Sequence, residues 1–392
     1  KLYSVLPADG VGDFTFSRGG TTGTSATRIN KDGLIETVAS GVSRLNYPLI
    51  DGVVNGCPSH LLEPSRLQLI PYSEDFENSD WTKNAGTTIT NNYATSPDGT
   101  LNASRYLGTG TSGLGDKFTL SAASYTLSFY VKSNTSENQF CALLGDSSQS
   151  SGDLLVTTEW KRISHTFTGS GLSNKTNGIF RDSSNNDIDI LIYGAQLEQG
   201  SYPTSYIPNY GTSAGITRVA ETATGAGDAS TFNDSEGVLM AEISGFNETV
   251  YANNWISLTD GTTNQNNYVS IQQDTAGNII SRVRVNGVNS AVLYSTIIDQ
   301  SLSSKIAIKY KLNDFSLYVN GFEYDSNNVG SIFSTNTLSK LSFDYNSLSN
   351  PFYGNTKQIQ YFDSALNDSD LEKITSWTSF TDLANGQTYS IK

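Results

Sequence analysis

The stretch Tyr125-Thr126-Leu127-Ser128-Phe129-Tyr130-Val131-Lys132 decides the fold class of this chain. The odd-numbered side chains from Tyr125 to Val131 fall on one side, and the even-numbered ones from Thr126 to Lys132 fall on the other. An apolar side chain at every second position is typical of a β-strand with one buried face. We therefore expect a half-buried strand here, with Tyr130 and Lys132 on its outward face.

Further short runs of β-branched and aromatic residues flank this strand, and clusters of Ser, Asn, Gly and Asp separate them. Within residues 69–210 these runs are Phe140–Leu144, Leu154–Thr157, Arg162–Thr168 and Ile188–Tyr193. Several short strands at such spacing predict a β-sandwich of the jelly-roll type.

Residues 235–376 repeat the pattern and predict a second sandwich. The expected strands are Gly237–Ile243, Trp255–Leu258, Tyr268–Gln273, Ile279–Val285, Ile306–Leu312, Phe315–Val319, Leu338–Asp344 and Thr356–Phe362. Asn320-Gly321 has the composition of a type I′ hairpin turn, and Asn313-Asp314 separates two alternating runs. Residues 367–374 predict one short helix, because Asn367 or Asp368 can cap it and acids fill its first turn.

Three other segments complete the predicted organisation. Residues 1–68 are irregular and predict an extended N-terminal module for attachment or assembly. Residues 211–234 are rich in Gly, Thr, Ala and Ser and predict a linker, and residues 377–392 predict a C-terminal tail. The predicted fold class is all-β: two β-sandwich (jelly-roll) domains, at 69–210 and 235–376, preceded by an extended N-terminal segment.

The net charge of −14 disfavours two classes of partner. Binding nucleic acid or an anionic membrane surface requires a basic patch, and the sequence has no Lys/Arg cluster. No apolar run reaches the roughly 18–20 residues of a membrane span, so we expect no membrane insertion. Cys57 and Cys141 lie among apolar neighbours, which predicts two buried free thiols.

The sequence lacks the usual residue constellations of an enzyme, which predicts a chain without catalytic activity. His60 and His165 are the only histidines. We expect His165 to be a strand residue on a polar face, whereas Cys57 and His60 would form a nucleophilic pair only if a third group oriented them. Asp187 and Asp189 share one strand face, but the acidic pattern of a glycosidase stops there.

One group of motifs lies within the first 66 residues: residues 13–18, 26–29, 33–36, Arg44-Leu45-Asn46-Tyr47 and Leu61-Leu62-Glu63-Pro64-Ser65-Arg66. These motifs look like an N-terminal module of bacteriophage tail fibre and receptor-binding proteins. Residues 72–83 and 96–100 continue this pattern. Trp160-Lys161-Arg162 and residues 194–208 resemble a carbohydrate-binding-module-like jelly roll, whereas residues 308–321 and 358–371 are similar to a concanavalin/laminin-G-like sandwich.

This resemblance implies a virion tail component that contacts the host cell surface through glycans. It also implies other virion tail proteins as partners and a homotrimer as the assembly. Fold similarity alone does not carry function, so other readings stay open. They are a purely structural virion subunit, a polysaccharide depolymerase and a secreted bacterial carbohydrate-binding protein.

Sugar binding uses aromatic platforms flanked by polar side chains, and four residues of the first sandwich fit this description. They are Trp81, Tyr130, Lys132 and Arg181. Trp255, Tyr268 and Tyr345 are the corresponding candidates in the second sandwich. The alternative for all of them is ordinary sheet packing or a subunit interface.

The prediction for cofactors is none, with a structural calcium as the alternative. Jelly rolls of the resembling class hold calcium near an element like Asp75-Phe76-Glu77 and an acid on a late strand. That strand reads Tyr193-Gly194-Ala195-Gln196 here, without the acid that a hard cation prefers.

Overall fold

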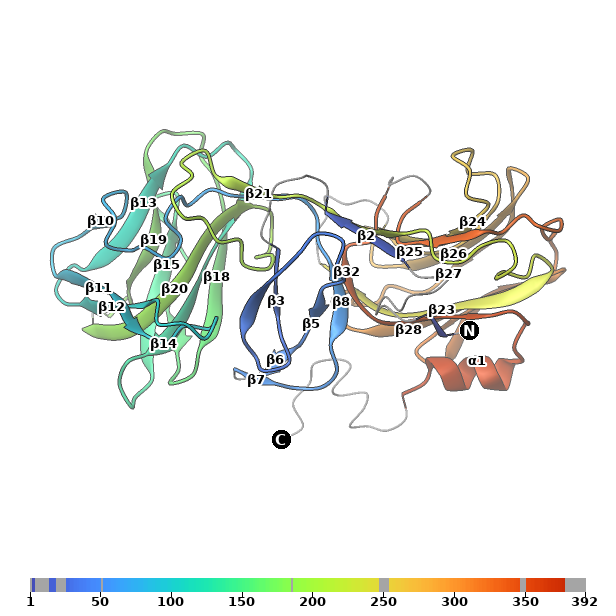
Figure 1. The fold of residues 1–392 in the computed structure, drawn as a ribbon, viewed down its shortest axis with the longest axis horizontal. Helices are drawn as coiled ribbons and strands as arrows, with labels where there is room; N and C mark the ends of the chain where they lie inside the picture. The colour runs from blue at the N-terminus through green and yellow to red at the C-terminus, as the bar shows by residue number, and fades with distance from the viewer. Residues whose placement is uncertain are drawn as a thin grey trace.

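The computed structural model describes residues 2–3, 14–18, 26–50, 52–184, 186–246, 254–345 and 350–377. Figure 1 shows two β-sandwiches side by side along the long axis, with strands of the N-terminal segment between them. The predicted all-β class is confirmed. The predicted boundaries of the domains stay predictions.

The first sandwich consists of two antiparallel sheets. In order across the first sheet, the strands are β10 (Thr82–Lys83), β13 (Gly113–Phe118), β19 (Lys175–Arg181), β15 (Gln139–Gly145) and β16 (Gln149–Ser150), and β17 (Leu154–Val156) also pairs with β15. The second sheet has the order β11 (Thr87–Ala94), β12 (Ala103–Gly108), β20 (Ile188–Gln199), β14 (Ser124–Ser133) and β18 (Lys161–Thr168).

The alternation of β14 produces the core of this sandwich. Tyr125, Leu127, Phe129 and Val131 all lie in one buried cluster, as their spacing predicts. Phe129 is fully buried, and burial of a side chain of this size contributes roughly 1.5–3 kcal/mol.

The second sandwich also has two antiparallel sheets. One has the order β30 (Phe322–Asn327), β29 (Asp314–Val319), β28 (Ser304–Lys311), β23 (Glu236–Gly245), β32 (Gly354–Phe362), β8 (Ser59–Leu62) and β5 (Leu45–Asn46), and β1 (Leu2–Tyr3) also pairs with β32. The other has the order β27 (Val288–Tyr294), β26 (Ile279–Val285), β25 (Tyr268–Gln273), β24 (Asn254–Thr259) and β31 (Lys340–Ser342). The predicted Asn320-Gly321 turn joins β29 to β30, with positive φ angles of 51° and 87°.

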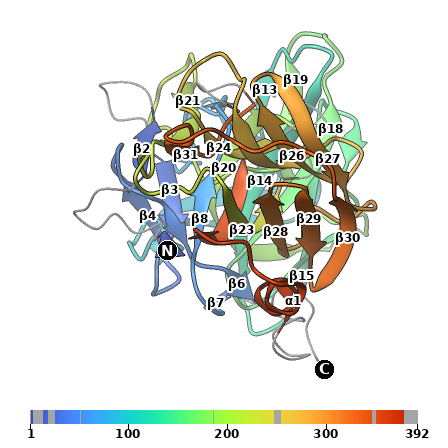
Figure 2. The same ribbon diagram turned by 90° about the vertical axis from the view of Figure 1, so that its right-hand side faces the viewer.

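The predicted short helix is α1 (Asp368–Thr375). Asn367 caps it, because its side chain accepts a hydrogen bond from the Asp370 N–H at 3.0 Å. The helix lies beside β28 and β29 (Figure 2). Its Leu371 packs with Val238, Met240 and Tyr318 on the outer face of the β23–β28–β29 sheet. Among the described residues, no helix is long and apolar enough to cross a membrane.

The N-terminal segment joins strands that are distant in the sequence. Besides β1, β5 and β8, it contributes two strands to pairs with strands of residues 211–234 and four strands to two hairpins of its own. These pairings are β2 (Thr15–Arg18) with β22 (Glu221–Thr224), β9 (Arg66–Gln68) with β21 (Ile216–Arg218), β3 (Ala26–Ile29) with β4 (Ile35–Val38), and β6 (Leu49–Ile50) with β7 (Val53–Val54). Phe14, Phe16 and Leu62 enter the core of the second sandwich. The predicted linker, residues 211–234, therefore contains two paired strands, and the predicted tail beyond Trp377 lies outside the described residues.

Five charged side chains meet where the N-terminal segment contacts residues 211–234, and we call them the junction cluster: Arg18, Arg44, Glu63, Arg218 and Glu221. Each side chain is at most 4% exposed. Glu221 Oε1 accepts from Arg18 Nη1 and from Arg44 Nε, each at 2.7 Å. Glu63 Oε2 lies 2.7 Å from Arg44 Nη2 and 2.7 Å from Arg218 Nη1. Arg44 and Glu63 belong to the motifs that carry the tail-protein resemblance, so in this fold those motif residues hold segments together.

Candidate functional site

Two of the four predicted sugar-binding residues lie inside the first sandwich. Trp81 is 2% exposed, packs against Phe76 and Phe129, and donates its indole N–H to the Tyr72 carbonyl at 2.9 Å. Arg181 is buried at the end of β19 and pairs with Asp187 at 3.5 Å. Neither side chain offers an open surface, because core packing and an ion pair occupy them.

The other two predicted residues, Tyr130 and Lys132, lie half-buried on the outward face of β14, as their alternation predicts. This face is covered by the chain itself. Ile29 and Ile35 of the β3–β4 hairpin pack there with Tyr130, and the Arg162 guanidinium lies 5.3 Å from the Tyr130 ring centroid. The structure thus does not bring the four predicted residues together in one site.

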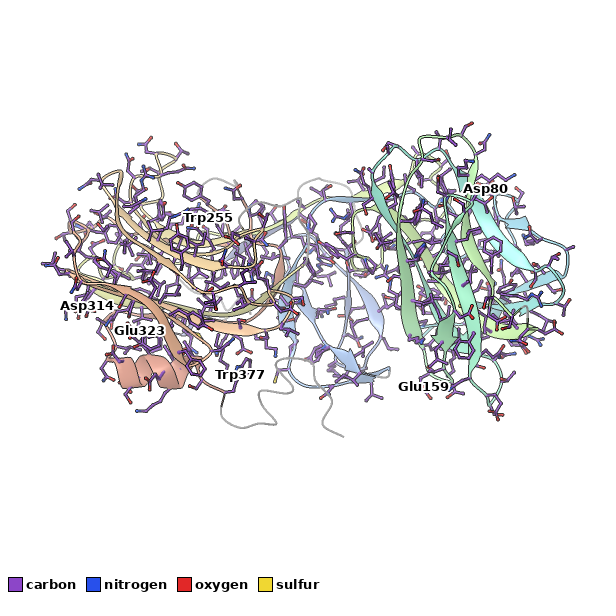
Figure 3. All side chains as sticks on the ribbon, turned by 180° about the vertical axis from the view of Figure 1, so that it is seen from behind. Asp80, Glu159, Trp255, Asp314, Glu323 and Trp377 are labelled. Atoms are coloured by element: carbon purple, nitrogen blue, oxygen red, sulfur yellow. The ribbon has the colours of Figure 1, made fainter. Side chains whose placement is uncertain are left out.

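The second sandwich does bring its three weaker candidates together. β24 and β25 turn Ile256, Leu258, Val269 and Ile271 into the core. Trp255 and Tyr268 occupy the alternate positions and lie on the outer face, where Tyr345 joins them from the segment after β31. Figure 3 labels Trp255 on this sheet.

The three aromatic rings form a compact cluster. The Trp255 ring centroid lies 3.9 Å from that of Tyr345 and 5.7 Å from that of Tyr268, and the two tyrosine rings are 5.4 Å apart and nearly perpendicular. Trp255 and Tyr268 are only 4% and 2% exposed, whereas Tyr345 is half-buried. Trp255 and Tyr268 therefore form the floor, and Tyr345 forms part of the wall.

Residues of β26 and β27 complete this feature, which we call the aromatic cleft. It has a volume of about 310 Å³ and is lined by Trp255, Tyr268, Arg282, Arg284, Asn289, Val292, Tyr294 and Tyr345. Arg282 and Arg284 occupy outward positions of β26, since Val283 and Val285 point into the core. Tyr294 is 49% exposed and presents the most accessible ring of the cleft. The cleft thus combines aromatic surface, two guanidinium groups and one amide.

Burial raises the pKa of the Tyr345 hydroxyl to about 12, and its interaction with Tyr268 acts in the same direction. The positive charges of Arg284 and Arg282 oppose this shift in the pKa. Tyr345 is therefore a neutral hydroxyl at physiological pH, able to donate and accept hydrogen bonds.

The sequence interpretation missed five of the cleft residues, although two signals were present. The first signal is the alternation within the predicted strand Ile279–Val285, which is consistent with Arg282 and Arg284 on the outward face. Asn286-Gly287, with φ angles of 49° and 81°, is a type I′ turn pair. Such a pair predicts a hairpin, and its second strand is β27, which carries Tyr294.

A larger cavity of about 620 Å³ lies on the first sandwich, where acids and amides dominate the lining together with Tyr72 and Tyr210. Two of its acids, Asp75 and Glu74, already have protein partners. Asp75 accepts from Asn91 at 2.6 Å, and Glu74 accepts from Asn102 at 3.2 Å and from Tyr206 at 2.9 Å. Because Asp75 and Glu74 bond within the sandwich itself, this cavity is the weaker candidate.

The described residues contain no group of three or more His, Cys, Asp or Glu side chains arranged to hold a metal ion. Asp75 is exposed, and its carboxylate bonds to Asn91. The structure therefore offers no observation that favours the calcium alternative.

The thiols and histidines correct two expectations. Cys141 is buried, but Cys57 is exposed, so only one of the two predicted buried thiols is found. His165 lies on the same face as Ile163 and Phe167, stacked on Phe167 at 5.8 Å, because all three have odd numbers in one strand. His60 is buried with its Nδ1 2.7 Å from Ser43 Oγ, and burial together with Arg44 and Arg18 lowers its pKa to about 3.

No protein-family model matches the chain, and no curated protein matches its sequence. Similar solved structures include the CBM40 of the Ruminococcus gnavus IT-sialidase bound to α2,3-sialyllactose, at 18% identity over 39% of this chain and 94% of that chain, with a TM-score of 0.33. Another is domain 4 of an extracellular arabinanase from Geobacillus stearothermophilus in complex with arabinotriose, at 14% identity over 40% and 73%, with a TM-score of 0.32. A SAP-like pentraxin from Limulus polyphemus gives 15% identity over 37% and 71%, with a TM-score of 0.30. At these values neither a family nor a ligand follows for this chain.

Proposed function

We propose that this chain is a non-enzymatic glycan-binding protein that holds a sugar in the aromatic cleft. The observation that carries the proposal is an open cleft on an outer sheet face, in which Tyr294, Tyr345 and Arg282 stand around a floor of two buried aromatic rings. Sugars present C–H faces that pack on aromatic rings and hydroxyls that bond to polar side chains. The cleft supplies both kinds of surface at one place.

The biological setting of this binding is proposed from the sequence. Residues 13–66 resemble the N-terminal module of phage tail proteins, which supports a tail fibre or receptor-binding protein located in the virion tail. In that setting the glycan belongs to the host cell surface, and the other tail proteins and further copies of the chain, as a homotrimer, are the protein partners. The alternatives are a purely structural virion subunit and a polysaccharide depolymerase.

The test is a titration of the purified chain with a panel of bacterial surface oligosaccharides, in which tryptophan fluorescence reports binding. Binding at the cleft changes the emission of Trp255, and a Trp255→Phe variant identifies that signal. We expect Tyr345→Ala to weaken binding about tenfold, because one stacked ring contributes roughly 1 kcal/mol beyond its buried area. The matched control is Tyr324→Ala, a partly exposed tyrosine on the edge strand β30 of the same sandwich.

The outcomes separate the candidate functions. Equal binding by the two tyrosine variants would remove the cleft from the proposal. An absence of binding to the whole panel, together with incorporation into virions, favours the structural subunit. Release of reducing ends from host polysaccharide would establish the depolymerase instead.

A further inference from the structure

The aromatic cleft contains two positive charges, Arg282 and Arg284, that have no carboxylate partner among the described residues. Arg282 Nη1 donates to the neutral Gln272 amide oxygen at 2.8 Å, and its guanidinium lies 5.7 Å from the Trp255 ring centroid. Within the described parts of the chain, neither Arg282 nor Arg284 forms an ion pair with an Asp or Glu. The Arg284 Nε is also buried without a hydrogen-bond partner in the described structure.

Unpaired arginines are unexpected in this protein, because its 38 acidic residues outnumber its 24 basic ones. Most other described arginines, among them Arg28, Arg44, Arg105 and Arg218, each pair with a carboxylate. Arg162 instead donates to the Ser128 hydroxyl and the Thr204 carbonyl. The aromatic rings around Arg282 and Arg284 also remove part of their hydration. A partly desolvated charge interacts more strongly with an opposite charge than one in bulk water does.

We propose that the aromatic cleft selects sugars that carry a carboxylate, and that Arg282 and Arg284 bind this group. The planar guanidinium matches a carboxylate through two parallel N–H···O bonds. Asn289 and Tyr345 then face the hydroxyls of the same sugar, while Tyr294 offers a ring to its apolar face. This inference rests on the proposed glycan-binding function, because it assigns the ligand class of the same cleft.

The size of the cleft limits the ligand further. Its volume of about 310 Å³ lies at the lower end of the roughly 300–1,000 Å³ of small-molecule sites. A site of this size suits one or two sugar units and not a long polysaccharide segment. The expected ligand is therefore a terminal or side-branch acidic sugar, such as a uronic or a sialic acid.

The first experiment compares ligands that differ only in the carboxylate. Galacturonic acid disaccharide is titrated beside its fully methyl-esterified form, and sialyllactose beside its methyl ester, by isothermal calorimetry with the full chain. We expect at least one acidic sugar to bind ten times or more tighter than its neutral counterpart. Its affinity should also fall as salt rises from 50 to 500 mM, because the ions screen the attraction.

The second experiment uses variants of the cleft. We expect Arg284→Gln to weaken binding of the acidic sugar at least tenfold and of the neutral counterpart less than threefold. Gln272→Glu should do the same, since it places an internal carboxylate beside Arg282. Lys132→Gln is the control, because it removes one positive charge from the outward face of the first sandwich.

Each outcome has a distinct meaning. Equal binding of acidic and neutral sugars would overturn the carboxylate inference and leave the proposed function intact. No binding of any sugar by a folded chain would overturn both. Loss of binding in Lys132→Gln but not in Arg284→Gln would move the site to the β14 face of the first sandwich.

Discussion

The junction cluster and the aromatic cleft use arginine in opposite ways. In the junction cluster three guanidinium groups surround Glu63 and Glu221, and all five side chains are buried. In the cleft, Arg282 and Arg284 are half-buried and have no carboxylate partner among the described residues. Arginine therefore holds chain segments together through ion pairs in the junction cluster. In the aromatic cleft its positive charge is available to a ligand.

The difference shows which charges a fold needs for itself. Removing one partner of a buried ion pair leaves the other charge desolvated, which costs several kcal/mol. A half-exposed arginine keeps part of its water, so its loss costs the fold little. Stability measurements can therefore separate structural arginines from those that are available to a ligand.

The largest expected effect comes from breaking the junction cluster. Glu221→Gln leaves Arg18 and Arg44 with less compensating charge, and we expect it to lower the free energy of unfolding by about 3–5 kcal/mol. Urea denaturation followed by tryptophan fluorescence measures this. The exposed Glu137→Gln serves as the control and should change the free energy by less than about 0.5 kcal/mol. A loss below 1 kcal/mol in Glu221→Gln would contradict the structural role of the cluster.

The next effect is a dependence of stability on pH. Burial by itself would raise the pKa of Glu63, but Arg218, Arg44 and hydrogen bonds from Ser205 outweigh it and lower the pKa to about 2, from an ordinary value of 4.5. A carboxylate with a depressed pKa stabilises the fold above the unfolded value and loses this contribution as pH falls through the folded value. Glu63 should therefore contribute roughly 3 kcal/mol to the free energy of unfolding at pH 5 and higher. This contribution should disappear as the pH falls toward 2.

Urea denaturation at intervals between pH 5 and pH 2 measures this contribution. Glu63→Gln should flatten the pH dependence, whereas Arg284→Gln should keep the slope of the unsubstituted chain. Identical slopes for Glu63→Gln and the unsubstituted chain would show that Glu63 has an ordinary pKa in the folded state.

The smallest expected effect belongs to the cleft. Arg282→Gln and Arg284→Gln should each change the free energy of unfolding by at most about 1 kcal/mol, because neither substitution leaves a buried carboxylate unpaired. Arg44→Gln in the junction cluster is the matched comparison and should cost several times more. If Arg284→Gln proved as costly as Arg44→Gln, the distinction between the two regions would fail.

Much of the fold could be predicted because it depends on local patterns. The alternation from Tyr125 to Lys132 corresponds to β14, and the cap at Asn367 corresponds to the start of α1. Asn320-Gly321 marks the hairpin between β29 and β30 because few other residues adopt those φ angles at low cost. In each case the controlling interactions span only a few residues.

The sites were harder to predict because long-range packing makes them. Trp255, Tyr268 and Tyr345 were candidates, but nothing local shows that Tyr345 stacks on a ring ninety positions earlier. Tyr130 has the alternation of an open face, yet the distant β3–β4 hairpin covers it. Arg44 and Glu63 look like surface charges in the sequence, and only their mutual contact explains their burial.

The pairing of β8 with β32 has a consequence for the synthesis of the protein. His60 lies opposite Thr356, and Ser59 Oγ bonds to Asn355 Oδ1 across 296 positions of the chain. On a ribosome that adds about 5–20 residues per second, β8 waits roughly 15–60 s before its partner exists. Until then its hydrogen-bonding edge and the apolar side chains of Leu61 and Leu62 have no native partner in β32. The second sandwich can therefore close only after β32 has been made, so the folding of β8 depends on a strand that is synthesised about 300 residues later.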